Sequence, residues 1–297
     1  MRLGALEAGG TKMVCSIGDE HGNVFSRVSY PTNSPEETLP VLIDYFAGEN
    51  IQALGISSFG PVDLKPDSPT YGYITSTPKP GWADCPILPR LRDTLGVPVG
   101  FDTDVNGAAL AEHRLGAARG LSSCLYVTVG TGIGGGIIAE NQIVHGLTHP
   151  EFGHFWLRPH PDDPTPQGFC PFHDGCLEGL ANGPAIEKRW GVPAQLLPPE
   201  HPAWTLESYY LAQMCVTAIV VFSPEKIILG GGVMQQTHLF ARIREQTVAM
   251  LGGYVRSPAI LTNIDDYIVP PGLGVNSGVT GALLLAAQAL EKKVAAQ

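Results

Sequence analysis

The sequence predicts an α/β protein made of two related halves that face each other, and three observations carry this prediction. Apolar residues make up 44% of the 297 residues, enough for a large core and too many for a disordered chain. The length suggests about two domains of roughly 100–200 residues each. Residues 3–27 and 125–146 share one pattern of apolar strand, Gly-Thr turn, second strand, polar turn and third strand. Their turns, Gly10-Thr11 and Gly130-Thr131, lie 120 residues apart, which indicates a repeat at the scale of a domain.

Helix signals fill the gaps between the strands. Ser34-Pro35-Glu36-Glu37 is a capping box with proline at the first helical position, so we expect a helix to about Phe46. Asp104 is expected to cap a helix over residues 104–115. Further helices are predicted over 206–222, 235–251 and 278–293, and buried strands over 53–58 and 226–229.

The composition excludes several classes of protein. The chain has 18 basic and 28 acidic residues, a net charge of −10, and no cluster of four basic residues, which argues against a nucleic-acid partner. No apolar run approaches the roughly 20 residues of a membrane span. Glu7 comes too early for the apolar stretch of a signal peptide. Six cysteines are too few for a disulfide scaffold of this length. We therefore expect a soluble cytoplasmic protein.

Three glycine-rich turns are candidate phosphate sites, because backbone amides without a neighbouring Cβ approach an anion closely. They are residues 7–12, 130–136 and 230–232. Ordinary glycine hairpins are the alternative. The second turn also fits the dinucleotide fingerprint, which requires a helix after the glycines. Residues 137–144 instead predict strand, turn and strand, so this reading is rejected.

Residues 101–107 bring two acids, Asp102 and Asp104, from an apolar strand to a helix start. A carboxylate in this place is suited to accept a proton from a sugar hydroxyl. Simple capping of the helix is the alternative.

A metal pattern occupies the proline-rich residues 158–175 and their surroundings. Cys170-x-x-His173-x-x-Cys176, with His154 before it, offers two thiolates and two imidazoles, which suit tetrahedral zinc. His149 and His160 are rival fourth ligands. Glu151 and Glu178 bracket this loop, so a zinc ion there would hold both acids in place.

In combination, residues 7–12, 104–106, 129–146, 151–154 and 170–178 resemble the ROK family (repressor, open reading frame, kinase) of sugar kinases, specifically its bacterial fructokinase branch. The resemblance covers nearly the whole chain. It implies an actin-like, ribonuclease-H-like fold of two α/β domains around an interdomain cleft. It also implies phosphorylation of a hexose by ATP with Mg²⁺, and the fructokinase branch favours D-fructose as the substrate. It further implies a homodimer.

The resemblance also implies roles for individual residues. Asp104 corresponds to the catalytic base. The sugar-contacting residues correspond to Gly60, Pro61, Asn106, Glu151, His154 and Glu178. The nucleotide-contacting residues correspond to Gly9, Gly10, Thr11, Lys12, Thr131, Gly132, Pro184, Gly230, Gly231, Gly232 and Val233. The structural Zn²⁺ ligands correspond to His154, Cys170, His173 and Cys176.

We expect residues 1–115 with 280–297 to form the smaller domain, which carries the first phosphate loop and the catalytic aspartate. Residues 116–279 then form the larger domain, with the second phosphate loop, the zinc loop and the adenosine side.

Two positions depart from most of the family. Glu7 stands where most relatives have Asp. Because glutamate is longer by one methylene group, we expect it to displace the Mg²⁺ by about that length or to bind it through a water molecule. His173 stands where most have a third zinc-binding cysteine. Both departures resemble the fructokinase branch. His154 has three possible roles: to bind zinc, to bind sugar, or to bind both through opposite ring nitrogens.

Overall fold

The computed structural model describes residues 1–295, which form two compact units. The first comprises Met1–Arg119, Ile143–Pro150 and the chain from Val275 onward. The second comprises Gly120–Gln142 and Glu151–Gly274. Ile143–Pro150 thus groups with the first unit, although the sequence analysis assigned it to the larger domain.

The first unit is built on a five-stranded sheet in the order β3-β2-β1-β4-β5. Strands β1, β2 and β3 pair antiparallel, whereas β4 and β5 pair parallel. Every residue of β4 is buried, as expected of a parallel strand covered on both faces. The strands are β1 (Leu3–Ala8), β2 (Lys12–Gly18), β3 (Val24–Pro31), β4 (Ala53–Ser58) and β5 (Val99–Thr103).

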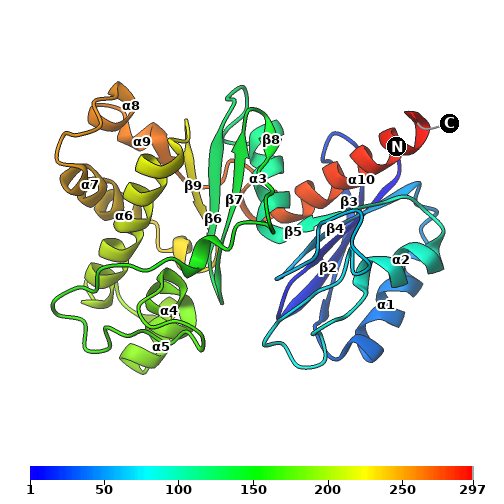
Figure 1. Ribbon diagram of the computed structural model, residues 1–297, viewed down its shortest axis with the longest axis horizontal. Helices are drawn as coiled ribbons and strands as arrows, with labels where there is room; N and C mark the ends of the chain where they lie inside the picture. Colours follow the sequence, from blue (N-terminus) through cyan, green and yellow to red (C-terminus); the bar gives the residue numbers. More distant parts are fainter. Residues whose placement is uncertain (296–297) are drawn as a thin grey trace. The chain divides into compact units, whose positions relative to one another are not determined.

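Helices cover both faces of this sheet (Figure 1). On one face, α10 (Ser277–Ala295) packs its Val279, Ala282 and Leu283 against β1 and β4. On the other face, α1 (Pro35–Ala47) and α2 (Ile87–Leu95) add apolar side chains to a second core. The alternation of side chains along β1 divides Leu3 and Ala5 from Leu6 and Ala8 between these two cores.

The second unit repeats this topology in the order β10-β9-β6-β7-β8. As in the first unit, the first two strands in sequence pair antiparallel and the parallel neighbours lie on the other side. The repeat predicted from the glycine turns is therefore confirmed. The strands are β6 (Cys124–Val129), β7 (Ile133–Ala139), β8 (Gln142–Ile143), β9 (Ile227–Gly230) and β10 (Ile268–Val269).

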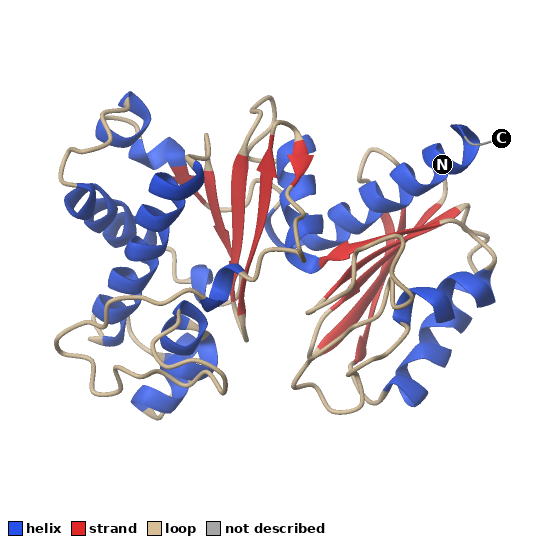
Figure 2. Cartoon of the chain, viewed as in Figure 1, coloured by secondary structure: helices blue, strands red, loops and turns tan. Residues whose placement is uncertain are grey.

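Helix α6 (Ala203–Phe222) runs through the second unit and packs against α7 (Leu239–Leu251). Helix α6 has the length and composition of a candidate membrane span, although it is not one uninterrupted apolar run, because Glu207 lies within it. However, 56% of its most apolar window is buried within the protein, as in a core helix. The remaining helices of this unit are α4 (Leu177–Ala181), α5 (Gly183–Trp190), α8 (Pro258–Leu261) and α9 (Ile264–Tyr267). Most of residues 155–176 lacks regular structure (Figure 2).

Helix starts show where sequence signals sufficed and where they did not. The helix after Ser34 is confirmed, and the Ser34 side chain accepts a hydrogen bond from Glu37 N. For α3 (Asp104–Arg114), the predicted cap is wrong by one residue. Thr103 is the N-cap, because its backbone is extended and its side chain accepts from Asn106 N, while Asp104 is the first helical residue. Helix α7 starts at Leu239 rather than 235, after a short 3₁₀ turn.

Candidate active site

In the first unit, the turn between β1 and β2 is held by Gly9. Gly9 N donates to Lys12 O at 3.0 Å, and Thr32 Oγ1 donates to Gly9 O at 2.7 Å. A side chain on Gly10 would meet no atom within 4 Å. Packing therefore does not require glycine at position 10. The space beside Gly10 leaves its backbone accessible to a ligand.

In the second unit, the structure brings the other nucleotide candidates together. Gly183 N donates to Gly130 O at 2.8 Å, and Asn182 Nδ2 donates to Thr131 O at 3.0 Å. The start of α5, with Pro184, is thus tied to the β6–β7 turn. A Cβ on Gly130 would lie 3.9 Å from Gly232 N, so the 230–232 run borders the same turn.

Two adjacent glycines in that run, Gly231 and Gly232, differ in whether the backbone conformation and packing require glycine. Gly231 has a φ of +92°, and a Cβ there would lie 2.4 Å from Val129 O. Gly232 would place its Cβ in open space. Backbone conformation and packing thus explain Gly231, whereas Gly232 leaves room for a ligand.

The acids at the end of β5 have different environments. Asp104 Oδ1 accepts a hydrogen bond from Val105 N at 2.9 Å at the first turn of α3. Asp102 is 3% exposed and is fully engaged by protein donors. Thr103 N and Asn106 Nδ2 donate to its Oδ1 at 2.8 and 2.7 Å, and His145 Nε2 lies 2.9 Å from its Oδ2. Sequence reasoning missed His145, because nothing local links it to Asp102.

His149 and Trp82, whose roles the sequence did not decide, are buried in the first unit and form hydrogen bonds there. His149 Nε2 accepts a hydrogen bond from Val62 N at 3.1 Å, beside the Gly60-Pro61 pair. Burial lowers the pKa of His149, which suits a neutral acceptor. Trp82, which the sequence allowed as a sugar platform, is fully buried and donates from Nε1 to Asn33 O.

Glu7 lies at the end of β1 and is largely buried. Burial raises the pKa of Glu7, and the charges of Arg27 and Lys12 act in the opposite direction. A Cβ on Gly278 would lie 2.7 Å from the Glu7 carboxyl carbon. Glycine at 278 therefore makes room for the Glu7 side chain. A carboxylate oxygen here is of the hard type that Mg²⁺ prefers.

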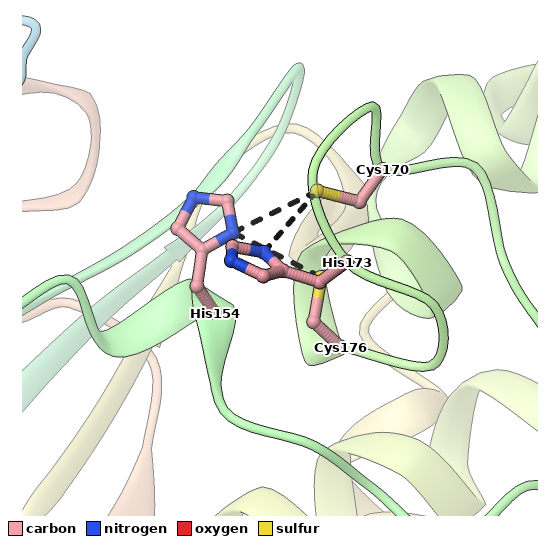
Figure 3. Close-up of side chains that lie close together, drawn as sticks. All are labelled: His154, Cys170, His173 and Cys176. Carbon is pink, nitrogen blue, oxygen red and sulfur yellow. Dashed lines mark hydrogen bonds between the residues drawn. The ribbon is translucent and has the colours of Figure 1, made fainter. Parts of the chain in front are cut away.

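The second unit assembles the predicted metal ligands (Figure 3). One ligand atom from each of His154, Cys170, His173 and Cys176 lies within 4.8 Å of every other. His154 Nδ1 is 3.9 and 3.8 Å from the sulfurs of Cys170 and Cys176, and His173 Nδ1 is 3.6 Å from Cys170 Sγ. Tetrahedral zinc with these ligands has donor separations of about 3.3–3.8 Å, and these three distances lie close to that range. The rival fourth ligand His149 lies in the first unit, and His160 packs on Tyr209.

His154 presents its second nitrogen to an acid. Its Nε2 points away from the sulfurs and lies 3.8 Å from Glu178 Oε1 (Figure 3). Glu178 Oε2 accepts from Ile133 N at 2.8 Å, at the start of β7. Burial, together with the charge of Glu178, raises the pKa of Glu151 to about 7. The metal cluster, two acids and the second glycine turn are thus one continuous arrangement within this unit.

Comparisons with known proteins agree on one family. The ROK family model matches residues 3–289. A putative fructokinase of Bacillus subtilis is 50% identical over 99% of this chain and 98% of its own length. A fructokinase of Pediococcus pentosaceus is 49% identical over 98% of this chain and 99% of its own. The crystal structure of a ROK hexokinase from Thermus thermophilus is 29% identical, with a TM-score of 0.78 over 98% of this chain and all of the other.

Proposed function

The chain belongs to the ROK family, and on this basis we propose that it is an ATP-dependent fructokinase. It transfers the γ-phosphoryl group of ATP to the 6-hydroxyl of D-fructose, giving fructose 6-phosphate and ADP. The observation that carries the proposal is identity of 50% and 49% to fructokinases over nearly the whole of both chains. The glycine turns and the acids described above are the parts that this chemistry needs.

The nucleotide roles rest on the glycine-rich turns, in which Gly10 and Gly232 adjoin open space. Backbone amides near Gly10, Thr131, Gly132 and Gly232 cradle the phosphates of MgATP, and the start of α5 with Pro184 serves the adenosine side. Glu7 would hold the Mg²⁺ of this substrate, directly or through water. An acidic chain thereby binds an anion through local amides and Mg²⁺ rather than through a basic surface.

The sugar roles follow from the family resemblance, residue by residue. Asp104 takes the proton of the attacking 6-hydroxyl while the oxygen bonds to the γ-phosphorus and the bond to ADP breaks. Gly60, Pro61 and Asn106 contact the sugar from the first unit. Glu151, His154 and Glu178 accept from or donate to its remaining hydroxyls.

Zinc would be held by His154, Cys170, His173 and Cys176. The fit of their separations to tetrahedral geometry supports this proposal. With four protein ligands the site is closed, so zinc supplies folding energy rather than chemistry. His154 then serves two partners, with Nδ1 on the metal and Nε2 toward the sugar and Glu178.

A coupled kinase assay over fructose, mannose, glucose and N-acetylmannosamine tests the proposal. We expect fructose to give the highest kcat/KM. Dominant activity on glucose would replace fructokinase by glucokinase, and mannokinase or N-acetylmannosamine kinase would be identified in the same way. A sugar-sensing regulator without catalysis would bind sugar and show no turnover.

We further propose that the enzyme is a cytoplasmic homodimer. None of the six cysteines forms a disulfide, as is usual in a reducing compartment. Light scattering on the purified chain tests the dimer, and a monomeric mass at micromolar concentration contradicts it.

A further inference from the structure

The segment Ile143–Pro150 supplies two histidines to the first unit, and both bind residues next to proposed sugar contacts. His145 reaches Asp102, at the end of β5. His149 accepts from Val62 N, directly after Gly60-Pro61. This segment follows β7 and β8 of the second unit in sequence and yet is anchored in the first. Two independent hydrogen bonds therefore fix it to the sugar side of that unit.

The bond to Asp102 has a defined direction. Because a carboxylate only accepts hydrogen bonds, His145 Nε2 must carry the proton and donate it to Asp102 Oδ2. The opposite oxygen, Oδ1, then requires donors, which are Thr103 N and the Asn106 amide nitrogen. With Asp102 only 3% exposed, water cannot replace these donors at low cost.

The same logic fixes the Asn106 side chain. Its NH₂ group must face Asp102, so its carbonyl Oδ1 points the other way. Asn106 is fully buried, and its Oδ1 accepts no hydrogen bond from any residue in the described part of the chain. A buried carbonyl oxygen without a donor is costly unless a ligand supplies one. A sugar hydroxyl is a suitable donor.

We propose that His145 is a positioning residue: through Asp102 it orients the Asn106 amide so that Asn106 Oδ1 accepts a hydroxyl of the hexose. The chain of donors and acceptors runs from His145 to Asp102, from Asp102 to the Asn106 NH₂, and from Asn106 Oδ1 to the sugar. The role of Asn106 rests on the proposed function, whereas the His145–Asp102–Asn106 arrangement is independent of it.

Steady-state kinetics of His145→Ala and His145→Gln test the proposal. We expect His145→Ala to raise KM for fructose about tenfold, the scale of one lost buried hydrogen bond, and to leave KM for ATP within about twofold. Gln places an amide donor near the position of Nε2, so His145→Gln recovers most of the loss. His21→Ala is the control, because His21 is a solvent-exposed histidine of the same unit with a 76% exposed side chain.

The outcomes separate the two proposals. If the wild-type protein phosphorylates no hexose, the proposed function fails. If it phosphorylates fructose and His145→Ala leaves KM for fructose unchanged, or raises both KM values equally, only the positioning role fails.

Ring-nitrogen NMR provides a readout besides activity. In the wild-type protein we expect His145 to hold its proton on Nε2 and to titrate above the ordinary histidine range, and Asp102→Asn to remove this upward shift. His149 and Tyr71 also interact electrostatically with this pair, so His149→Gln and Tyr71→Phe are titrated alongside. A wild-type His145 whose pKa is not raised above the ordinary histidine value would contradict the pairing.

Discussion

The two units share one strand order, but their long loops are stabilised in different ways. In the first unit, residues 59–86 between β4 and α2 bury Val62, Ile74 and Trp82 in the core, and Asp63 bonds to Ser68 and Thr70 within the loop. In the second unit, residues 155–176 leave Trp156 and Phe172 70% and 72% exposed. This loop exposes these two large side chains and carries three of the four candidate metal ligands, Cys170, His173 and Cys176, while His154 directly precedes it.

The difference in side-chain burial between the two loops suggests why only one of them would need a metal ion for its stability. A long loop that buries aromatic and aliphatic side chains is stabilised by the hydrophobic effect. One that does not must be held by cross-links, and a structural zinc site provides them. The proposed roles differ as well: the first unit carries the base Asp104, and in the second unit the proposed sugar contacts His154 and Glu178 flank the loop that carries the candidate metal ligands.

The largest effect on activity is expected from Asp104→Asn, which removes the proposed base and leaves both long loops intact. We expect kcat to fall by at least about 100-fold, the scale of general-base loss, with KM for fructose within a few-fold. Glu178→Gln, on the metal-held side, should instead raise KM for fructose with a smaller change in kcat. Turnover of Asp104→Asn near the wild-type level would show that the base is assigned to the wrong residue.

Removal of zinc should destabilise one unit only. A strong chelator, or Cys176→Ser, should lower Tm by at least about 5 °C, because metal binding supplies folding free energy. Hydrogen exchange should rise in residues 154–180 and stay unchanged in 59–86. Cys85→Ser is the matched control, since Cys85 is a buried thiol of the long loop in the first unit. Less than about half an equivalent of zinc in the untreated protein would refute a site of this affinity.

The neighbouring glycines of the second unit allow packing to be separated from ligand access. Gly231→Ala should lower the free energy of unfolding by about 1–3 kcal/mol, because the backbone has a positive φ and the methyl would meet Val129 O. Gly232→Ala should leave it within about 0.5 kcal/mol and raise KM for ATP. Chemical denaturation with paired kinetics checks both. Equal destabilisation by the two substitutions would contradict the distinction.

The smallest effect is a pH dependence of the first unit. The hydrogen bond from His145 to Asp102 raises the pKa of His145, so its folded-state pKa lies above its unfolded value. The resulting stabilisation is fully present below the unfolded pKa and is lost as pH rises through the folded pKa. Compared with His145→Gln, the wild-type protein should gain more stability at about pH 5.5 than at about pH 8.5. The difference should stay below about 1 kcal/mol, because the ring is 43% exposed. A constant difference across this range would contradict it.

The sequence by itself determined the features that depend on neighbours in the chain. The repeated Gly-Thr turns predicted two sheets with one topology, because strand alternation and turn chemistry are local. The capping box at Ser34 predicted α1 for the same reason. The spacing of Cys170, His173 and Cys176 predicted three ligands of one metal site, because a short loop cannot separate them widely.

Only the tertiary structure decided the features that depend on distant residues. It placed His154, and not His149 or His160, beside Cys170, His173 and Cys176, and it grouped Ile143–Pro150 with the first unit. It moved the cap of α3 to Thr103 and joined Asp102 to His145 across 43 residues. These choices are set by which side chains the packed sheets and helices bring within hydrogen-bonding or ligand distance, and no local pattern encodes that distance.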